Sequence, residues 1–188
     1  MARLPDIIAE KLSLAQRRVH DAIVSGPRGR VQGPLRVWLT SPDLADKAQA
    51  LGAFCRFGTS LPPRLSELAI LVTGAHWQAG FEWFAHAPIA LEAGLGADAV
   101  AALRIGSVPR FELADEAAVY AFAHELVTRR RVSRLTYEQA QAVLGETAVV
   151  ELVAILGYYS LVSMTIVAFE IDLPTGHADP FADRPPLG

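Results

Sequence analysis

The sequence predicts an all-α protein, a bundle of about eight helices in a single domain covering residues 1–188. Apolar residues recur at spacings of three and four along most of the chain, a pattern typical of amphipathic helices. No run of alternating apolar and polar residues lies between hairpin turns, so no strand is expected. With 188 residues, 52% of them hydrophobic, the chain is long enough to bury a sizeable core.

Four helices are expected in the first half of the chain. The first is amphipathic, and a break from Gly26 to Gly33 follows it. Ser41 and Pro42 predict the start of the second, because serine caps a helix and proline suits its first turn. Gly80 separates the third helix from the fourth. These helices are expected over residues 5–23, 42–57, 64–79 and 81–93.

The second half is expected to begin with a short helix that starts in the AlaAspAlaVal segment at residues 97–100. Three further helices are predicted over residues 113–131, 136–144 and 146–171. The tail, residues 172–188, contains PTGHADPFADRPPLG, whose prolines and glycines oppose a helix. We expect the tail to be irregular, and either to pack on a neighbour or to be loose.

The segment from Leu152 to Phe169 carries no charged side chain and is long enough to be considered as a membrane span. Glu151 and Glu170 flank it, however, and neither side has the cluster of lysine and arginine expected beside a span. No second segment of this kind is present. The segment is therefore interpreted as a core helix, partly covered by a neighbouring subunit, and no membrane association is expected.

Charge and cysteine content exclude several other classes. The 17 basic and 20 acidic side chains give a net charge of −3, and the short arginine run at residues 129–134 lacks interleaved aromatics, so no nucleic-acid partner is expected. Cys55 is the single cysteine, which excludes an intrachain disulfide and a CxxC redox pair. The N-terminus has no uninterrupted apolar region typical of a signal peptide. A cytoplasmic location is expected.

Glu67, Glu82 and His86 are the candidate catalytic residues. Glu82 and His86 are four residues apart on one expected helix and therefore share a face. Glu67 lies among leucines and alanines of the preceding helix, where a carboxylate needs a partner. If the two helices fold back at Gly80, Glu67 meets His86 and a proton relay results.

Two other interpretations of these residues stay open. The glutamates and the histidine can simply satisfy one another as a structural group, because buried polar groups usually form such pairs. Two carboxylates and an imidazole are also a metal-ligand set, although no further histidine or aspartate recurs at a matching spacing and no metal is expected.

Nearby aromatic and basic residues are candidates for substrate contact. Trp83 and Phe84 flank Glu82 and either form a pocket wall or pack in the core. Guanidinium groups bind carboxylates through paired hydrogen bonds, which makes some arginines candidate sites for an anionic substrate. These arginines are Arg30, Arg36 and Arg56. His76 lies late in its helix and is expected to make a helix-end or subunit contact.

The stretch LPPRLSELAILVTGAHWQAGFEWFAHAPIALEAGLG, residues 61–96, resembles the carboxymuconolactone decarboxylase family, which includes the alkylhydroperoxidase-D-like proteins. In the peroxidase branch a glutamate precedes a CxxC motif, and a histidine follows the second cysteine by four residues. Glu67 and His86 take the glutamate and histidine places, while Ala79 and Glu82 stand at the two cysteine places. The dithiol is missing, and the Ala, Glu, Trp and His of AGFEWFAH instead resemble the decarboxylase branch, which has Glu before Trp and the same histidine spacing. Peroxide reduction is therefore not expected.

The resemblance implies a lyase that works without a cofactor or metal, decarboxylating a small carboxylated lactone or a related product of aromatic degradation. Together with the spacing, it implies that His86 is the acid or base, that Glu67 orients and charges it, and that Glu82 either completes the relay or supplies the proton itself. Trp83 and Arg56 are assigned to substrate contact. The alternative is a non-catalytic oligomeric helical protein in which the same glutamates and histidine are structural.

The resemblance covers residues 61–105. The N-terminal helix, the segment GPRGRVQGPLRVWL and the tail make the chain longer than the minimal decarboxylase domain, so the substrate does not follow from the resemblance. Family membership also implies a homo-oligomer, either a trimer or a hexamer, with sites near the subunit contacts.

Overall fold

The computed structural model describes residues 2–5 and 7–185, and within these ranges it contains helices and no strand. The all-α prediction is confirmed, with nine α-helices in the described part where about eight were expected. A 3₁₀ turn spans Ala9–Lys11. The α-helices are α1 (Leu14–Ser25), α2 (Pro34–Trp38), α3 (Pro42–Phe57), α4 (Pro63–Trp77), α5 (Gly80–Glu92), α6 (Ala97–Ile105), α7 (Ala114–Arg129), α8 (Arg134–Leu144) and α9 (Glu146–Ala168).

The first helix begins later than predicted. Residues 5–23 were expected to be helical, but α1 starts at Leu14, and residue 6 lies outside the described residues. Ser13 explains the boundary, because its hydroxyl accepts from the backbone N–H of Gln16 while the Gln16 side chain accepts from the backbone N–H of Ser13. This reciprocal cap fixes the start of the helix more strongly than apolar periodicity does.

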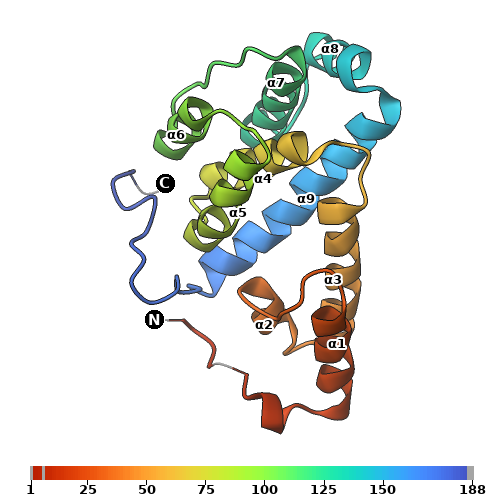
Figure 1. Ribbon diagram of the computed structural model, residues 1–188, viewed down its shortest axis with the longest axis vertical. Helices are drawn as coiled ribbons and strands as arrows, with labels where there is room; N and C mark the ends of the chain where they lie inside the picture. Colours follow the sequence, from red (N-terminus) through yellow and green to blue (C-terminus); the bar gives the residue numbers. More distant parts are fainter. Residues whose placement is uncertain (1, 6, 186–188) are drawn as a thin grey trace.

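The short helix α2 was not predicted. It follows Gly33, whose positive φ of 54° turns the chain into Pro34. The buried Trp38 at its end donates from Nε1 to Thr165 Oγ1 of α9, at 3.0 Å. A helix of five residues depends on such tertiary contacts, which periodicity cannot reveal. This bond ties the end of α2 to the C-terminal part of α9, and α2 lies beside the lower end of α9 in Figure 1.

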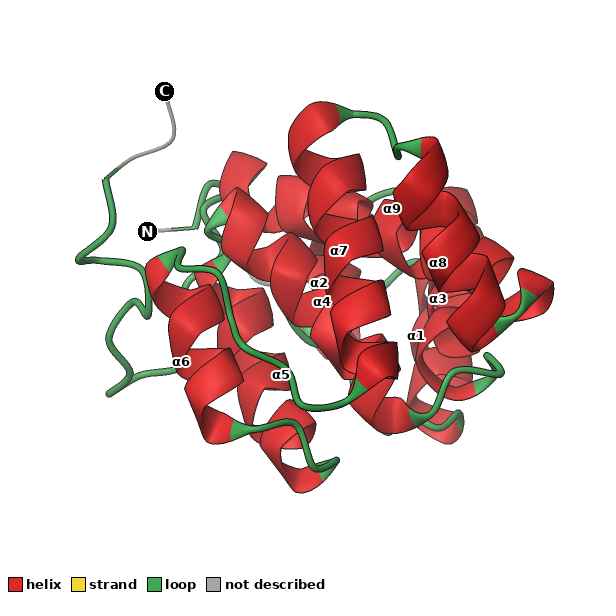
Figure 2. Cartoon of the chain, turned by 90° about the horizontal axis from the view of Figure 1, so that it is seen from above, coloured by secondary structure: helices red, strands yellow, loops and turns green. Residues whose placement is uncertain are grey.

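Helix α4 is the central element of the fold. All of its residues from Leu65 to Ala75 are buried, and it packs against α5, α7 and α9. Its N-terminal Arg64 pairs with Asp115 of α7 at 2.8 Å and also contacts Glu116. Viewed from above, α6 and α8 lie on opposite sides of the molecule, and loops run over the outside (Figure 2). The buried side chains of α4 from Leu65 to Ala75 therefore have to be compatible with a fully packed interior.

Helix α9 is the apolar helix noted in the sequence. By length and composition it could cross a membrane, but 56% of its most apolar stretch is buried within the fold. It packs against α4 and crosses the molecule diagonally in Figure 1. This burial is consistent with a core helix of a soluble protein. Its outer face exposes apolar side chains, namely Val150, Val153, Leu161, Met164 and Val167.

The described part of the tail, up to residue 185, is irregular as predicted, and it packs on its own chain. Phe181 is buried with its ring edge against Trp83 of α5, the ring centroids lying 5.3 Å apart. Arg184 donates to the carbonyl of Ala75 at 2.9 Å. The tail is thus held to the core, an arrangement that the sequence did not indicate. Residues 186–188 lie outside the described residues.

Gly52 in α3 provides a test of the packing between α3 and α9. A Cβ atom at this position would collide with Tyr158 Oη of α9 and with the guanidinium of Arg28. We expect Gly52→Ala to lower the free energy of unfolding by about 1 to 3 kcal/mol, because overpacking a tight contact displaces side chains. Urea-induced unfolding followed by circular dichroism measures this change.

Gly157→Ala is the matched control, since Gly157 is also a helical glycine but has no atom of a neighbouring group within 4 Å of the position that an added methyl group would take. We expect this substitution to raise the free energy of unfolding by about 0.5 to 1 kcal/mol through helix propensity. Equal effects of the two substitutions would contradict the packing described here.

Candidate functional site

The turn between α4 and α5 brings two of the predicted site residues onto facing helices. Helix α4 ends at Trp77, and Gln78 reverses the chain with a left-handed backbone of φ 50°. Helix α5 then begins at Gly80 and packs against α4. Glu67 and His86 both point into the space between the two helices, where their side chains meet. The predicted helical hairpin is therefore present, with the turn residue at position 78.

Glu67, His86 and Glu82 form a buried acid, imidazole and acid series. His86 Nδ1 and Glu67 Oε2 are hydrogen-bonded at 2.7 Å. His86 Nε2 lies 3.0 Å from Oε1 of Glu82, one turn earlier on α5. The exposed fraction of each side chain is only 5% or 6%. The predicted contact between Glu67 and His86 is present, and both ring nitrogens face a carboxylate.

Glu82 has one oxygen with an incomplete hydrogen-bond complement. The approach of His86 Nε2 is close enough for an ion pair but is not aligned as a hydrogen bond, and no other described group donates to the buried Oε1. A buried carboxylate oxygen without an aligned donor is costly. Because Glu82 also lines a cavity, this oxygen can accept a hydrogen bond from a molecule that enters it.

The two carboxylates determine the protonation state of His86. Burial penalises the charged imidazolium and acts to lower the pKa of His86. The charge of Glu82, with the contacts and charge of Glu67, outweighs this penalty and raises the pKa to about 9. At neutral pH, His86 is therefore a protonated imidazolium that lies in a largely dry environment and can donate a proton.

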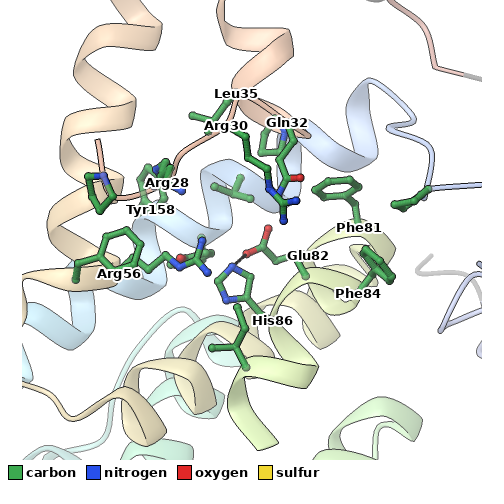
Figure 3. A pocket seen from close by; sticks show the side chains of 18 residues that line it. Arg28, Arg30, Gln32, Leu35, Arg56, Phe81, Glu82, Phe84, His86 and Tyr158 are labelled. Carbon is green, nitrogen blue, oxygen red and sulfur yellow. Dashed lines mark hydrogen bonds and ion pairs between the residues drawn. The ribbon is translucent and has the colours of Figure 1, made fainter. Parts of the chain in front are cut away.

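A cavity of about 470 Å³ opens over Glu82 and His86 (Figure 3). Its walls come from α5, from the end of α3, from the middle of α9 and from the connection between α1 and α2. Charged, polar and aromatic side chains predominate among the lining residues. They are Pro27, Arg28, Arg30, Gln32, Pro34, Leu35, Arg56, Phe57, Phe81, Glu82, Phe84, Ala85, His86, Ile89, Tyr158, Tyr159, Val162 and Pro174.

Two tyrosines of α9 form one wall of this cavity. The ring of Tyr159 stands edge-on to His86, with the centroids 5.2 Å apart. Burial, together with the charges of Glu82 and Glu67, raises the pKa of Tyr159 well above its usual value. Burial likewise raises the pKa of Tyr158 to about 12. Both phenols are thus neutral at physiological pH and serve as wall and hydrogen-bonding groups.

The other predicted residues divide between the cavity and the rest of the fold. Arg56, Arg30 and Phe84 line the cavity, whereas Arg36 lines a neighbouring hollow beside the N-terminal segment. Trp83 is buried against Phe181 of the tail and is not among the lining residues. Substrate contact by Trp83, which was expected from the sequence, does not fit this position. Its neighbours Glu82 and Phe84 reach the cavity because successive residues are rotated by about 100° around the helix.

His76 lies near the end of α4 in a separate hollow with Trp77, away from Glu67. Burial lowers its pKa, so it is neutral under most conditions. This placement agrees with the predicted helix-end contact. It also leaves His86 as the histidine that faces the main cavity in the described chain.

Sequence reasoning missed Arg28 and the two tyrosines. Arg28 lies two residues before Arg30, in the segment that breaks the helical pattern, and nothing in its local pattern distinguishes it. Tyr158 and Tyr159 were hidden inside an apolar run that was interpreted as core. The signal that could have marked them is a polar hydroxyl group in an otherwise apolar run. Tyr158 also lies four residues before Val162, on the same face of the helix, and both residues line the cavity.

Within residues 2–5 and 7–185, no group of three His, Cys, Asp or Glu side chains is arranged to hold a metal ion. The reason is geometric at Glu67, Glu82 and His86. Because the imidazole lies between the two carboxylates, the three side chains do not converge on a common point outside them.

Comparison with known proteins identifies the fold. No protein-family model and no curated protein sequence matches the chain. Among solved structures, an uncharacterized peroxidase-related protein from Silicibacter sp. TM1040 is similar, with a TM-score of 0.73 and 12% sequence identity. The match covers 93% of this chain and 92% of that one. The fold is alkylhydroperoxidase-D-like.

On this alkylhydroperoxidase-D-like fold, the residues at the predicted cysteine places are Ala79, which is buried, and Glu82. Cys55 is buried on α3 and is the single cysteine of the chain. Burial raises its pKa, which disfavours the reactive thiolate. The site is therefore suited to moving protons and lacks the cysteine pair of dithiol redox chemistry.

The raised pKa of His86 predicts a pH-dependent stability. The unfolded histidine titrates near pH 6.5, so the folded state holds the extra proton between about pH 6.5 and 9. The stabilisation is complete below this window and is lost as the pH rises through it. We expect wild-type protein to lose up to about 3 kcal/mol of unfolding free energy more than His86→Gln over this window. Urea unfolding at several pH values measures the difference.

His86→Gln is the informative comparison because it replaces the titrating imidazole by an amide that does not titrate but still forms hydrogen bonds. Parallel pH profiles for the two proteins would contradict the raised pKa. A steeper decline in His86→Gln than in the wild type would contradict its direction.

Proposed function

We propose that this protein is an acid–base enzyme of the carboxymuconolactone decarboxylase type, acting without a cofactor on a small carboxylated lactone or a related product of aromatic degradation. The observation that carries the proposal is His86, an imidazolium at the wall of a substrate-sized cavity, held between Glu67 and Glu82. The motif around these residues and the fold of the whole chain support the same family.

The proposed reaction consumes one proton and releases carbon dioxide. The bond between the lactone ring and its carboxylate breaks, and its electron pair moves through the conjugated system onto the ring carbonyl oxygen. A proton is then delivered to carbon as the carbonyl re-forms. His86 is the proposed donor, acting directly from Nε2 or through the cavity-facing Glu82, and water at the cavity mouth restores the proton.

Glu67 is proposed as a positioning residue. Its hydrogen bond to Nδ1 fixes the orientation of the ring and leaves Nε2 directed toward Glu82 and the cavity. Its negative charge also helps to keep the imidazole protonated. Arg56, whose guanidinium points toward His86 in Figure 3, is proposed to bind a carboxylate of the substrate.

A cytoplasmic location and a trimeric or hexameric assembly belong to the same proposal. The exposed apolar side chains along the outer face of α9 support the assembly, because a contiguous apolar surface is unusual on a monomer. Sedimentation velocity on the purified protein measures the oligomeric state.

The second candidate is a non-catalytic helical protein in which the same charged group is structural. The internal pairing favours it, since both nitrogens of His86 already have a carboxylate neighbour within the chain. Under this alternative, Glu67→Ala destabilises the fold and no turnover of any lactone or β-keto acid is found. Loss of turnover in a variant that keeps its stability would argue against it.

The activity prediction concerns His86. We expect His86→Gln to reduce decarboxylation of a carboxylated γ-lactone by at least about 100-fold, because positioned acid–base groups contribute roughly 10² to 10⁴ in rate. Release of carbon dioxide measures the rate. In the wild type, kcat should fall as the pH rises through about 9, where His86 loses its proton.

Glu92→Gln is the matched control, since Glu92 lies exposed at the end of the same helix and should leave the rate unchanged. Circular dichroism must show that His86→Gln keeps its helices. Full turnover in a folded His86→Gln protein would remove the proposed role of this residue.

A further inference from the structure

A second hollow, of about 430 Å³, adjoins the cavity that lies over Glu82 and His86. The two spaces are neighbours because Gln32, Phe81 and Pro174 line both of them. We call the second space the N-terminal hollow, since the segment before α1 forms one of its walls. It is therefore within reach of a molecule that is bound in the cavity.

The segment before α1 is anchored to the end of α9 and to the start of the tail. The backbone N–H of Arg3 donates to the carbonyl of Phe169 at 3.0 Å, and its guanidinium donates to the carbonyl of Ala168 at 2.9 Å. The backbone N–H of Ala2 donates to the carboxylate of Asp172, also at 2.9 Å. The hollow is thus enclosed by a wall that several hydrogen bonds hold in place.

The walls of the N-terminal hollow are mainly apolar. Their apolar side chains come from the segment before α1, from α2, from the residue after α9 and from the tail, and include Leu4, Ile7, Val37, Phe169, Ile171 and Leu173. Arg36 and Asp172 bring one charge of each sign to the described lining. The cavity, by contrast, is lined by several arginines. The hollow is therefore suited to an uncharged, apolar group.

Phe81 stands at the boundary between the two spaces. Its ring rests on Gly33, where a Cβ atom would overlap the ring carbons, and Gly33 also has a positive φ of 54°. In Figure 3 the ring lies on the opposite side of Glu82 from Arg56. A ligand whose carboxylate is bound by Arg56 can therefore direct its other end past Glu82 toward Phe81 and the hollow.

Burial of an apolar group in such a space provides binding free energy. Each methylene group that leaves water for an apolar environment tightens binding by up to about fourfold. The apolar side chains come from segments that are far apart in the sequence, so the fold has gathered them around a space that they do not fill. An apolar substituent of a ligand can fill it.

We propose that the N-terminal hollow binds an apolar substituent of the substrate, so that the enzyme acts on a carboxylated ring that carries an alkyl or aryl side chain. Val37, Phe81 and Leu173 are the specificity-determining residues for this side chain. The inference rests on the proposed function for the identity of the reacting ring. Binding of the substituent is measurable without turnover.

Isothermal titration calorimetry with two unreactive probes tests the inference. 4-Methylbenzoate and 4-pentylbenzoate have the same ring and carboxylate and differ only in the length of the alkyl chain. Wild-type protein should bind 4-pentylbenzoate about tenfold or more tightly, because the longer chain buries additional methylene groups. Val37→Phe and Leu173→Trp place larger side chains in the hollow and should reduce this gain to about threefold or less.

Two control variants separate the hollow from other apolar surfaces. Val143→Phe makes the same substitution as Val37→Phe at an exposed position of α8 that lines neither space, and it should leave the gain unchanged. Val150→Ser alters the exposed apolar face of α9 and should also leave it unchanged. Circular dichroism establishes which variants are folded, and Leu173→Trp, in the irregular tail, decides if Val37→Phe does not fold.

Four results would overturn the inference. These are equal binding of the two probes by the wild type, binding of neither probe, an undiminished gain in the folded hollow-filling variants, and loss of the gain in Val150→Ser. The last result would assign the binding of the alkyl chain to the outer face of α9.

The outcomes also distinguish this inference from the proposed function. A gain from the pentyl chain that the hollow-filling variants remove, without turnover of any lactone, supports the apolar subsite and contradicts the decarboxylase. Turnover of a carboxylated lactone, with no gain in binding from an alkyl chain, supports the decarboxylase and overturns the subsite.

Discussion

The burial of a carboxylate in the central helix is the constraint on which the rest of the structure depends. Every neighbour of Glu67 in α4 from Leu65 to Ala75 is buried, so its charge has no access to bulk water. An isolated charge in such a place costs several kcal/mol, on the order of what stabilises a whole domain. His86 meets this cost, and the need for that contact fixes the position of α5 relative to α4.

The same constraint explains why Glu82 takes part. Burying the imidazolium between helices also has a desolvation cost, and the negative charge of Glu82, one turn away on α5, offsets part of that cost. The three groups together carry one net negative charge when His86 is protonated, and the arginines on the opposite wall of the cavity face this charge. The charges buried in the core and the charges on the cavity wall therefore interact with one another.

The sequence predicted the parts of this arrangement that depend on local spacing. The i, i+4 relation of Glu82 and His86 and the isolation of Glu67 among apolar residues were sufficient to place the three side chains together. Most helix boundaries followed from prolines and glycines. Helix α1 was placed too early because the reciprocal cap at Ser13 was not recognised, and α2 was missed because it depends on a bond between Trp38 and Thr165.

The composition of the cavity could not be predicted for a related reason. Arg28 and Tyr158 are 130 residues apart, and their contact depends on a third position, Gly52, in another helix. Trp83 was expected to touch a substrate because it is adjacent to Glu82, yet adjacent residues on a helix face different directions. Long-range packing decides which of several equivalent arginines or aromatics reaches a site, and spacing along the chain carries no information about it.

The distribution of the cavity residues along the chain has a consequence for redesign. Glu67, Glu82 and His86 come from one compact hairpin, α4 and α5, whereas Arg28 and Arg30 come from a connection that contributes little to the buried core. That connection can be exchanged as a cassette, much as loops are exchanged on antibody or barrel scaffolds. Under the proposed function, its replacement would change which molecules the cavity accepts while the buried hairpin continued to supply the acid.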